Sequence, residues 1–214
     1  MSVLLDHLPE LWQGLVVTLQ LAVASFAGAA VLGVLITAMR VSPVGVLRAM
    51  GTAYVEAFQN LPLLVLLTLA YFGLPEIGIK GSELVTAMVV ISLYTAAYIA
   101  EALRSGVNAV GKGQGEAARA LGLTFRQSLW HVILPQALRT VVQPLGNITI
   151  ALLMNTTLAG AISVVDLTEE AKRVNLVEAQ PIPIFVGVGL VYALIAAGVG
   201  FVTGRLERRL VMVR

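Results

Sequence analysis

Long apolar stretches, separated by short charged segments, dominate this chain. Five stretches contain no Asp, Glu, Lys or Arg: Leu11 to Met39, Ala57 to Pro75, Leu84 to Ala100, Thr140 to Val165 and Ala179 to Gly204. A helix of about 20 apolar residues crosses the hydrocarbon core of a bilayer while satisfying its own backbone hydrogen bonds. The third stretch is long enough if its helix continues to Arg104 or beyond. The pattern predicts an all-α, polytopic membrane protein with five transmembrane helices in one domain over residues 1–214.

The composition excludes several classes of function. Hydrophobic residues make up 58% of the chain and charged residues 12%, whereas soluble domains carry about 25% charged residues. The chain has no cysteine, and its two histidines are far apart, so neither a redox site nor a zinc site is expected. The basic residues are scattered singly, which argues against a nucleic-acid partner. We expect no catalytic residue, metal or cofactor in this chain.

The distribution of basic residues predicts the orientation of the five helices. Of the 14 Lys and Arg residues, all except Lys80, Lys172 and Arg173 fall on one side of a five-span arrangement. Because cytoplasmic segments are enriched in Lys and Arg, we expect that side to be the cytoplasm. The N-terminus is then outside and the C-terminus is cytoplasmic.

A polar segment from Ser105 to Pro135 is the longest cytoplasmic loop in this arrangement. Its Ala-rich part, Glu116 to Leu121, favours a helix, with Glu near the N-terminus where it complements the helix dipole. Gly122 is expected to end this helix or to permit the close approach of another backbone. A second amphipathic helix is predicted from Thr124 to Leu134, ended by Pro135.

The same loop carries a spaced motif that resembles the cytoplasmic signature of ABC importer permeases. It reads Glu116-Ala117-Ala118, three residues, Gly122, nine residues, then Val132, any residue, and Leu134-Pro135. Val132 stands where Ile is usual. The resemblance covers nearly the whole chain and implies the transmembrane domain of a type I ABC importer, in the plasma membrane of a prokaryote.

Other segments are similar to particular branches of that family. The polar amino-acid uptake branch is indicated by Ala97 to Gly106, Gly113-Gln114 and Leu134 to Arg139. Its glutamate permeases are indicated by Arg40 to Pro43 and Met154 to Leu158. The resemblance therefore implies transport of a polar amino acid and leans to glutamate.

The resemblance also implies that the loop docks on a cytoplasmic ABC ATPase subunit. Two copies of that subunit would bind ATP and Mg²⁺, so this chain would be a transport subunit and not an enzyme. Small side chains would allow close approach, while apolar and charged side chains would anchor and pair with the partner. The predicted coupling residues are Glu116, Ala117, Ala118, Arg119, Gly122, Leu123 and Phe125. An ordinary amphipathic surface loop is the alternative.

The fourth stretch is the most polar of the five, and polar groups inside a membrane are candidates for a pathway or for helix packing. Asn155, Thr156 and Thr157 are predicted to lie near the middle of the bilayer. The resemblance implies that they contribute to an amino-acid pocket, where amides and hydroxyls would hold the α-carboxylate and α-ammonium. The alternative is hydrogen bonding between helices at a dimer seam.

Two residues of the expected pathway depart from the family pattern. Met154 stands where many relatives carry Lys, and Gln59 stands where an Arg is common. Both changes remove a positive charge that would attract a carboxylate. Two interpretations stay open: this chain is the less substrate-engaged subunit of a heterodimer, or its pocket is built mainly from dipoles.

The remaining charged residues suggest structural and docking roles. Glu101 and Arg104 are predicted to form an i,i+3 pair with a gating or structural role, which we also assign to Pro135. The acidic outside loops 76–83 and 166–180 are the expected docking face for an extracytoplasmic solute-binding protein. A second permease subunit, identical or different, and membrane lipids complete the expected partners.

We therefore expect the permease subunit of an ATP-driven importer of polar amino acids that works by alternating access. Two other classes stay open. An ion-gradient-driven secondary carrier would need inverted repeats and a buried ionisable relay, but five spans do not divide into equal halves. A membrane scaffold that only recruits a partner would explain the loop and leave the polar fourth stretch unused.

Overall fold

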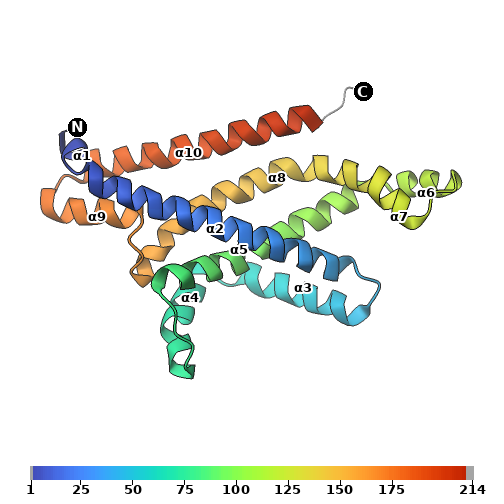
Figure 1. The fold of residues 1–214 in the computed structure, drawn as a ribbon, viewed down its shortest axis with the longest axis horizontal. Coiled ribbons are helices and arrows are strands. Elements are labelled where there is room, and N and C mark those ends of the chain that lie inside the picture. The colour runs from blue at the N-terminus through green and yellow to red at the C-terminus, as the bar shows by residue number, and fades with distance from the viewer. Residues whose placement is uncertain (1, 211–214) are drawn as a thin grey trace.

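The computed structural model describes residues 2–210, which form helices and no strand. Four long helices run side by side (Figure 1): α2 (Leu8–Val41), α5 (Glu83–Ala109), α8 (Leu134–Asn155) and α10 (Pro181–Leu210). The shorter helices are α1 (Ser2–Asp6), α3 (Gly45–Asn60), α4 (Leu63–Thr68), α6 (Lys112–Ala120), α7 (Phe125–Ser128) and α9 (Leu167–Glu178). Two π-helical turns, η1 (Leu69–Gly73) and η3 (Leu129–Ile133), and two 3-10 segments, η2 (Leu74–Ile77) and η4 (Thr156–Ile162), connect them.

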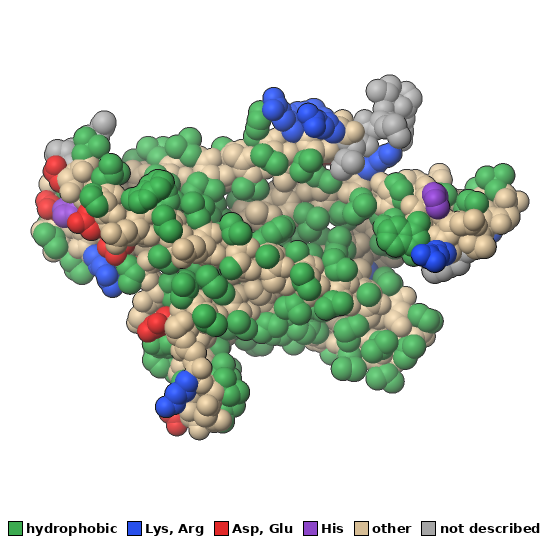
Figure 2. All heavy atoms as spheres, viewed as in Figure 1, with side chains coloured by type: hydrophobic (Ala, Val, Ile, Leu, Met, Phe, Trp, Pro, Cys, Tyr) green, Lys and Arg blue, Asp and Glu red, His purple; other side chains and the backbone are tan. Residues whose placement is uncertain are grey.

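The α5 helix forms the centre of the bundle. It contacts α2, α3 and α8, and Ala96, Ala97 and Ala100 on it are fully buried. Helix α10 is outermost and contacts α1, α8 and α9. Apolar side chains cover much of the visible surface, whereas charged side chains gather toward the ends of the bundle (Figure 2). An apolar surface of this kind suits helices that face lipid. Each helix also satisfies the hydrogen bonds of its own backbone, which lipid cannot do.

The predicted all-α membrane fold is confirmed, and the five predicted spans correspond to four or five in the structure. Among the described residues, four segments are long and apolar enough to cross a membrane: Leu8–Val41, Glu83–Ala109, Arg126–Ile162 and Pro181–Arg209. A fifth span arises if the bent pair Gly45–Asn60 and Leu63–Ile77 is counted as one. The third predicted stretch does continue past Arg104, to Ala109.

The second predicted span, Ala57 to Pro75, is not one straight helix. The helix breaks at Leu61 and Pro62, and its two halves meet at 102°. Proline has no N–H to donate and disfavours helical backbone in the residue before it. Leu61 is accordingly extended, with φ −102° and ψ 135°. The first half begins as early as Gly45.

The prediction that Pro135 ends a helix is wrong. The helical path runs from Arg126 to Ile162 and passes through the π-helical turn η3, where the N–H of Leu134 donates to the carbonyl of Leu129. This wider turn accommodates the missing N–H of Pro135 without a break. The residues from Arg126 onward and the fourth span therefore form one continuous helical element.

Small residues of α2 form a close-packed seam with α5. Ser25, Ala29 and Gly33 are all buried, and a Cβ added at Gly33 would lie 2.6 Å from Cγ2 of Ile99. The Ser25 hydroxyl donates to the carbonyl of Met88 at 3.3 Å. The two helices approach this closely because the stripe lacks bulky side chains.

A buried polar network fixes α9 against α2 and α10. The carboxylate of Asp166, which is fully buried, accepts the N–H of Glu169 at 2.9 Å and the hydroxyl of Tyr192 at 3.1 Å. The hydroxyl oxygen of Thr18 accepts the N–H of Leu167 at 3.1 Å. Burial raises the pKa of the Asp166 carboxyl, and its hydrogen bonds oppose that rise. The segment expected as an outside loop from residue 166 is thus a firmly held helix.

Gly14 of α2 lies directly against the start of α9 and provides a test of this packing. A Cβ added there would be 2.9 Å from both the carbonyl oxygen of Asp166 and the Cα of Leu167. Gly14→Ala should lower the free energy of unfolding by about 1–3 kcal/mol, although Ala favours helix. The thermal unfolding midpoint in nanodiscs measures this. Gly198→Ala on α10, where an added Cβ meets nothing within 4 Å, should leave the midpoint unchanged or raise it; equal midpoints would contradict the contact.

Candidate functional site

The α6 helix ends in a Schellman motif at Gly122. Gly122 has φ +78°, a left-handed conformation that glycine adopts without strain. Its N–H donates to the carbonyl of Arg119 at 2.9 Å, and the N–H of Leu123 donates to the carbonyl of Ala118 at 3.1 Å. A Cβ added at Gly122 would meet nothing within 4 Å. Gly122 thus ends the helix, one of the two roles expected of it, and its outer side is sterically open to a partner.

The residues of α6 divide into an inner and an outer face. Ala118 is only 3% exposed, and α6 packs on η3. Glu116, Ala117 and Arg119 are exposed, although Glu116 and Arg119 also line a hollow that reaches Ile133 of η3, and Leu121 after the helix is 81% exposed. The two alanines of the motif therefore occupy different environments: Ala118 makes internal contacts, and Ala117 is available to a partner.

A capping box begins the helix that follows α6. The hydroxyl oxygen of Thr124 accepts the N–H of Gln127 at 3.3 Å, while Oε1 of Gln127 accepts the N–H of Thr124 at 2.9 Å. Leu123 is half-buried. Phe125 begins α7, but its side chain lies outside the described part of the structure, so its anchoring role stays a prediction. In Figure 1, α6 and α7 stand together at one end of the bundle.

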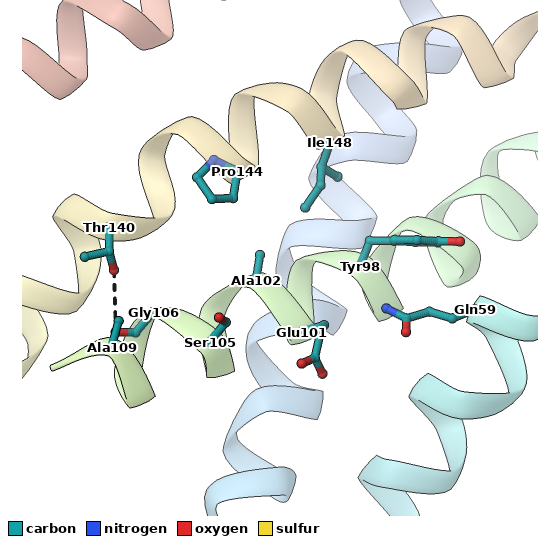
Figure 3. A pocket seen from close by; sticks show the side chains of 10 residues that line it. All are labelled: Gln59, Tyr98, Glu101, Ala102, Ser105, Gly106, Ala109, Thr140, Pro144 and Ile148. Carbon is teal, nitrogen blue, oxygen red and sulfur yellow. Dashed lines mark hydrogen bonds between the residues drawn. The ribbon is translucent and has the colours of Figure 1, made fainter. Parts of the chain in front are cut away.

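A cavity of about 320 Å³ lies between α3, α5 and α8. Gln59 enters it from the end of α3, Tyr98, Glu101 and Ser105 from α5, and Thr140 from α8 (Figure 3). Pro144 and Ile148 add an apolar wall. A few polar groups on a largely apolar lining can orient a small polar molecule. Among the described residues, no group of three or more His, Asp or Glu is placed to hold a metal ion.

Glu101 is held by two arginines from different helices. Its carboxylate accepts hydrogen bonds from Arg40 of α2 and from Arg104, whose Nη2 lies 2.5 Å from Oε1. The Arg40 side chain is only 10% exposed, and a Cβ added at Gly51 of α3 would lie 2.8 Å from its Cγ. The structure therefore contains the predicted i,i+3 pair within a triad that ties α2 to α5.

Sequence reasoning missed Arg40 as a member of this site. Arg40 is 61 residues from Glu101 in sequence, and a lone Arg at the end of an apolar stretch is explained equally well by the positive-inside rule. Its partnership with Glu101 arises only from the packing of α2 on α5.

The residues expected to line the pathway fall into two groups. Gln59 lines the cavity together with Glu101. The others lie at and just beyond the C-terminal end of α8, away from the cavity lining: Met154, Asn155, Thr156 and Thr157. Thr156 is fully buried, and both threonine hydroxyls donate to carbonyls of the same helical segment, at 2.7 and 2.8 Å. The half-buried Asn155 amide is consequently the group best placed there for a ligand.

The triad predicts unequal effects of neutralising its members. Glu101→Gln should lower the free energy of unfolding by about 1–3 kcal/mol, because the buried Arg40 loses its charged partner. Arg104→Gln should cost less than about 1 kcal/mol, since Arg104 is 34% exposed and water replaces its contact. Thermal unfolding in nanodiscs compares the two variants. The double variant Arg40→Gln/Glu101→Gln should recover part of the stability that Glu101→Gln loses. If the losses of the two single variants simply add in the double variant, the pairing is ruled out.

Comparison with known proteins places the whole chain in one family. The family described as "Binding-protein-dependent transport system inner membrane component" matches residues 29–212. The chain is 37% identical over 209 residues to the probable glutamine ABC transporter permease protein GlnM of Bacillus subtilis (strain 168), covering 98% of this chain and 97% of that protein. It is 44% identical over 169 residues to the glutamate transport system permease protein GluC of Corynebacterium efficiens, covering 73% and 72%.

Solved structures agree with this placement. The fold matches the crystal structure of an amino acid ABC transporter with histidines with a TM-score of 0.90 and 29% identity, over 96% of both chains. The inward-facing MetNI methionine ABC transporter gives a TM-score of 0.79 at 22% identity, over 97% and 99% of the two chains, which is a likeness of fold alone. This chain therefore belongs to the binding-protein-dependent transport system inner membrane components, among the amino-acid ABC importer permeases that its loop motif resembles.

Proposed function

We propose that this chain is the permease subunit of an ATP-driven importer of glutamate or a closely related amino acid. The observation that carries the proposal is α6, a short helix with an exposed Ala117 and an open Gly122 cap, at one end of a bundle whose open cavity is lined by a few polar groups. Relatives named as glutamine and glutamate permeases support the substrate class.

In this proposal, the end of the bundle that carries α6 faces the cytoplasm of a prokaryotic cell. The bias of Lys and Arg toward that end supports the orientation, which leaves the N-terminus outside and the C-terminus inside. The segment 105–135 is then the cytoplasmic coupling loop. The solute-binding protein lands at the opposite end, on segments 76–83 and 166–180, and the buried hydrogen bonds of Asp166 give α9 the rigidity that a docking surface needs.

The energy comes from a separate ATPase subunit in two copies, which bind ATP and Mg²⁺. Ala117 and the outer side of Gly122 allow its surface to approach α6 closely, and the exposed Glu116 and Arg119 offer charges for ion pairs. Ala118 points inward, so it serves by holding α6 on η3 rather than by touching the ATPase. Leu123 and Phe125 contribute apolar contacts beside the cap.

A second permease subunit, identical or related, covers surfaces that the isolated chain leaves exposed. Gln143 and Asn147 are exposed on α8 within a membrane-spanning segment, where an amide facing lipid is costly. Residues Leu63–Ile77 leave the bundle at 102° to α3 and expose Phe72 and Ile77. A partner subunit would satisfy both features.

Transport follows from alternating access of the pathway. The amide of Gln59 holds the substrate carboxylate by its dipole in the cavity, because Met154 and Gln59 supply no positive charge. The amide of Asn155, away from the cavity, offers a second polar group along the pathway. The Glu101 triad acts as a gating or structural tie between α2 and α5. ATP binding closes the two ATPases and favours the outward-open state, and hydrolysis returns the pair to the inward-open state.

The coupling role of α6 is tested by placing bulk and charge on its outer face. Ala117→Arg should reduce substrate-stimulated ATP hydrolysis by about tenfold or more, because a large side chain at the centre of a docking surface prevents close approach. Gly122→Asp should act in the same direction. The measurement is ATP turnover by the co-purified complex in lipid vesicles, with glutamate-loaded solute-binding protein added. The thermal unfolding midpoint is measured as well, and Ala117→Arg should leave it unchanged.

Gly45→Arg is the matched control, since Gly45 begins α3, outside the segment 105–135, and an added Cβ there meets nothing within 4 Å. This variant should keep the normal stimulation of ATP hydrolysis. The same turnover in Ala117→Arg and Gly45→Arg would refute docking through this face. ATP-independent uptake by the chain alone would identify a secondary carrier, and ATPase binding without uptake of any amino acid would identify a scaffold.

The substrate proposal is tested in the same vesicles with glutamate, glutamine, arginine and histidine. Glutamate and glutamine should be taken up best. Gln59→Leu should lower kcat/KM for them by about tenfold, the effect of one lost hydrogen bond to a bound ligand. Asn60→Leu removes a neighbouring exposed amide that donates to the carbonyl of Glu56 at 2.7 Å and should keep uptake. Equal losses in the two variants would exclude a direct contact of Gln59 with the substrate.

A further inference from the structure

Helix α10 presents two unlike faces. The packed face includes Ile184, Val188 and Tyr192, all buried, and continues to Thr203, which meets α8 so closely that a Cβ added at Gly146 would lie 2.6 Å from its Cγ2. Helical spacing places Glu207 one turn beyond Thr203 on the same side, and Glu207 is half-buried. The single acid of this region therefore points toward the bundle.

Three arginines occupy the opposite face. Arg205, Arg208 and Arg209 are exposed, and Figure 2 shows a basic group at this end of α10. The guanidinium carbon of Arg205 lies 4.5 Å from the ring centroid of Phe201, itself 57% exposed. This cation–π contact holds the charge beside an apolar ring on the outer surface of the helix.

Among the described residues these arginines have no acidic partner, as is also true of Arg48, Arg126 and Arg139, but they are three that lie together on one face of one helix. Arg40 and Arg104 pair with Glu101, and Lys172 and Arg173 pair with acids one turn away. Within residues 2–210, no ion pair involves an arginine of α10. Three unneutralised guanidinium groups on one face make a strong site for an anion.

The surface that leads to the arginines is apolar. Leu190, Leu194, Val202 and Leu206 are exposed along α10, and this outermost helix is only 17% buried within its span. Acyl chains of a lipid fit such a strip, and a phosphate fits the guanidinium groups at its end. One ligand that joins acyl chains to an anionic head satisfies both parts of the surface.

We propose that the C-terminal end of α10 is a binding site for an anionic phospholipid. Its phosphate accepts hydrogen bonds from Arg205, Arg208 and Arg209, and an acyl chain lies along Phe201 and Leu194. An ATPase surface is another possible partner for three arginines. Lipid is the better match, because α6 and α7 stand apart from the end of α10 (Figure 1) and the arginines continue a lipid-facing strip.

The test uses the complete complex in nanodiscs of phosphatidylcholine with or without phosphatidylglycerol. Lipids retained after release into detergent are counted by native mass spectrometry. The wild type should retain phosphatidylglycerol over phosphatidylcholine. The variant Arg205→Gln/Arg208→Gln/Arg209→Gln should lose this preference by about tenfold or more, since one arginine near an anionic surface changes binding by about fivefold. Arg48→Gln/Arg126→Gln, which removes two exposed arginines elsewhere, should keep it.

A second variant separates lipid binding from membrane insertion, because three fewer positive charges also change the topology signal. Arg205→Lys/Arg208→Lys/Arg209→Lys keeps the charge and removes the planar forks; it should insert normally and lose part of the preference. Unchanged retention in the Gln variant would overturn the site. Loss of ATPase co-purification with lipid retained would show a protein contact instead, and displacement of the lipid by inorganic phosphate would show a site for free anions.

Discussion

Every backbone N–H and carbonyl inside a bilayer must find a partner within the protein, because lipid supplies none. This requirement accounts for the four long helices and confines irregular backbone to places that other elements cover. The helix break at Leu61 and Pro62 leads into α4, and the 3-10 segment η4 follows α8. Helix α4 and η4 pack against each other, and both pack on α5. The central helix thus shields η4, whereas the break itself, where Leu61 is 44% exposed, is left for the proposed second subunit to cover.

The same requirement limits which side chains can serve a substrate. Thr37, Thr149 and Thr203 each donate their hydroxyl to a carbonyl four residues earlier, at 2.7, 2.8 and 2.9 Å. A hydrogen bond of this kind, from a threonine hydroxyl to a carbonyl of the same helix, uses the hydroxyl's one donor, so that donor is not available to a substrate. The amides of Gln59 and Asn155 have more capacity, because an amide carries two donors and an acceptor. A pocket built mainly from dipoles, one of the two interpretations of the missing Lys and Arg, would use these amides.

The sequence predicted the long helices well, because bilayer thickness directly requires long apolar stretches. Two helices differ in shape from the prediction, and both differences concern proline. Pro62 interrupts the helix where an uncharged run indicated one span. At Pro135 the helix continues, although the sequence predicted that it ends there. The difference depends on whether the neighbouring turn can widen, as η3 does, and tertiary packing decides this. The Arg40 contact with Glu101 was hidden for the same reason, since it depends on how α2 packs on α5.

The continuity of the helix through Pro135 bears on how the proposed coupling would work. Helix α6 packs on η3, η3 continues into α8, and α8 contributes to the cavity wall with Thr140, Pro144 and Ile148. A displacement of α6 by a docked ATPase would therefore reach the cavity through one helical element, whereas a break at Pro135 would have separated the two. In this arrangement Ala117 receives the partner, and the buried Ala118 keeps α6 seated on η3. A large side chain at Ala118 would separate α6 from η3. It would therefore prevent a movement of α6 from reaching the cavity even where the ATPase still docks on α6.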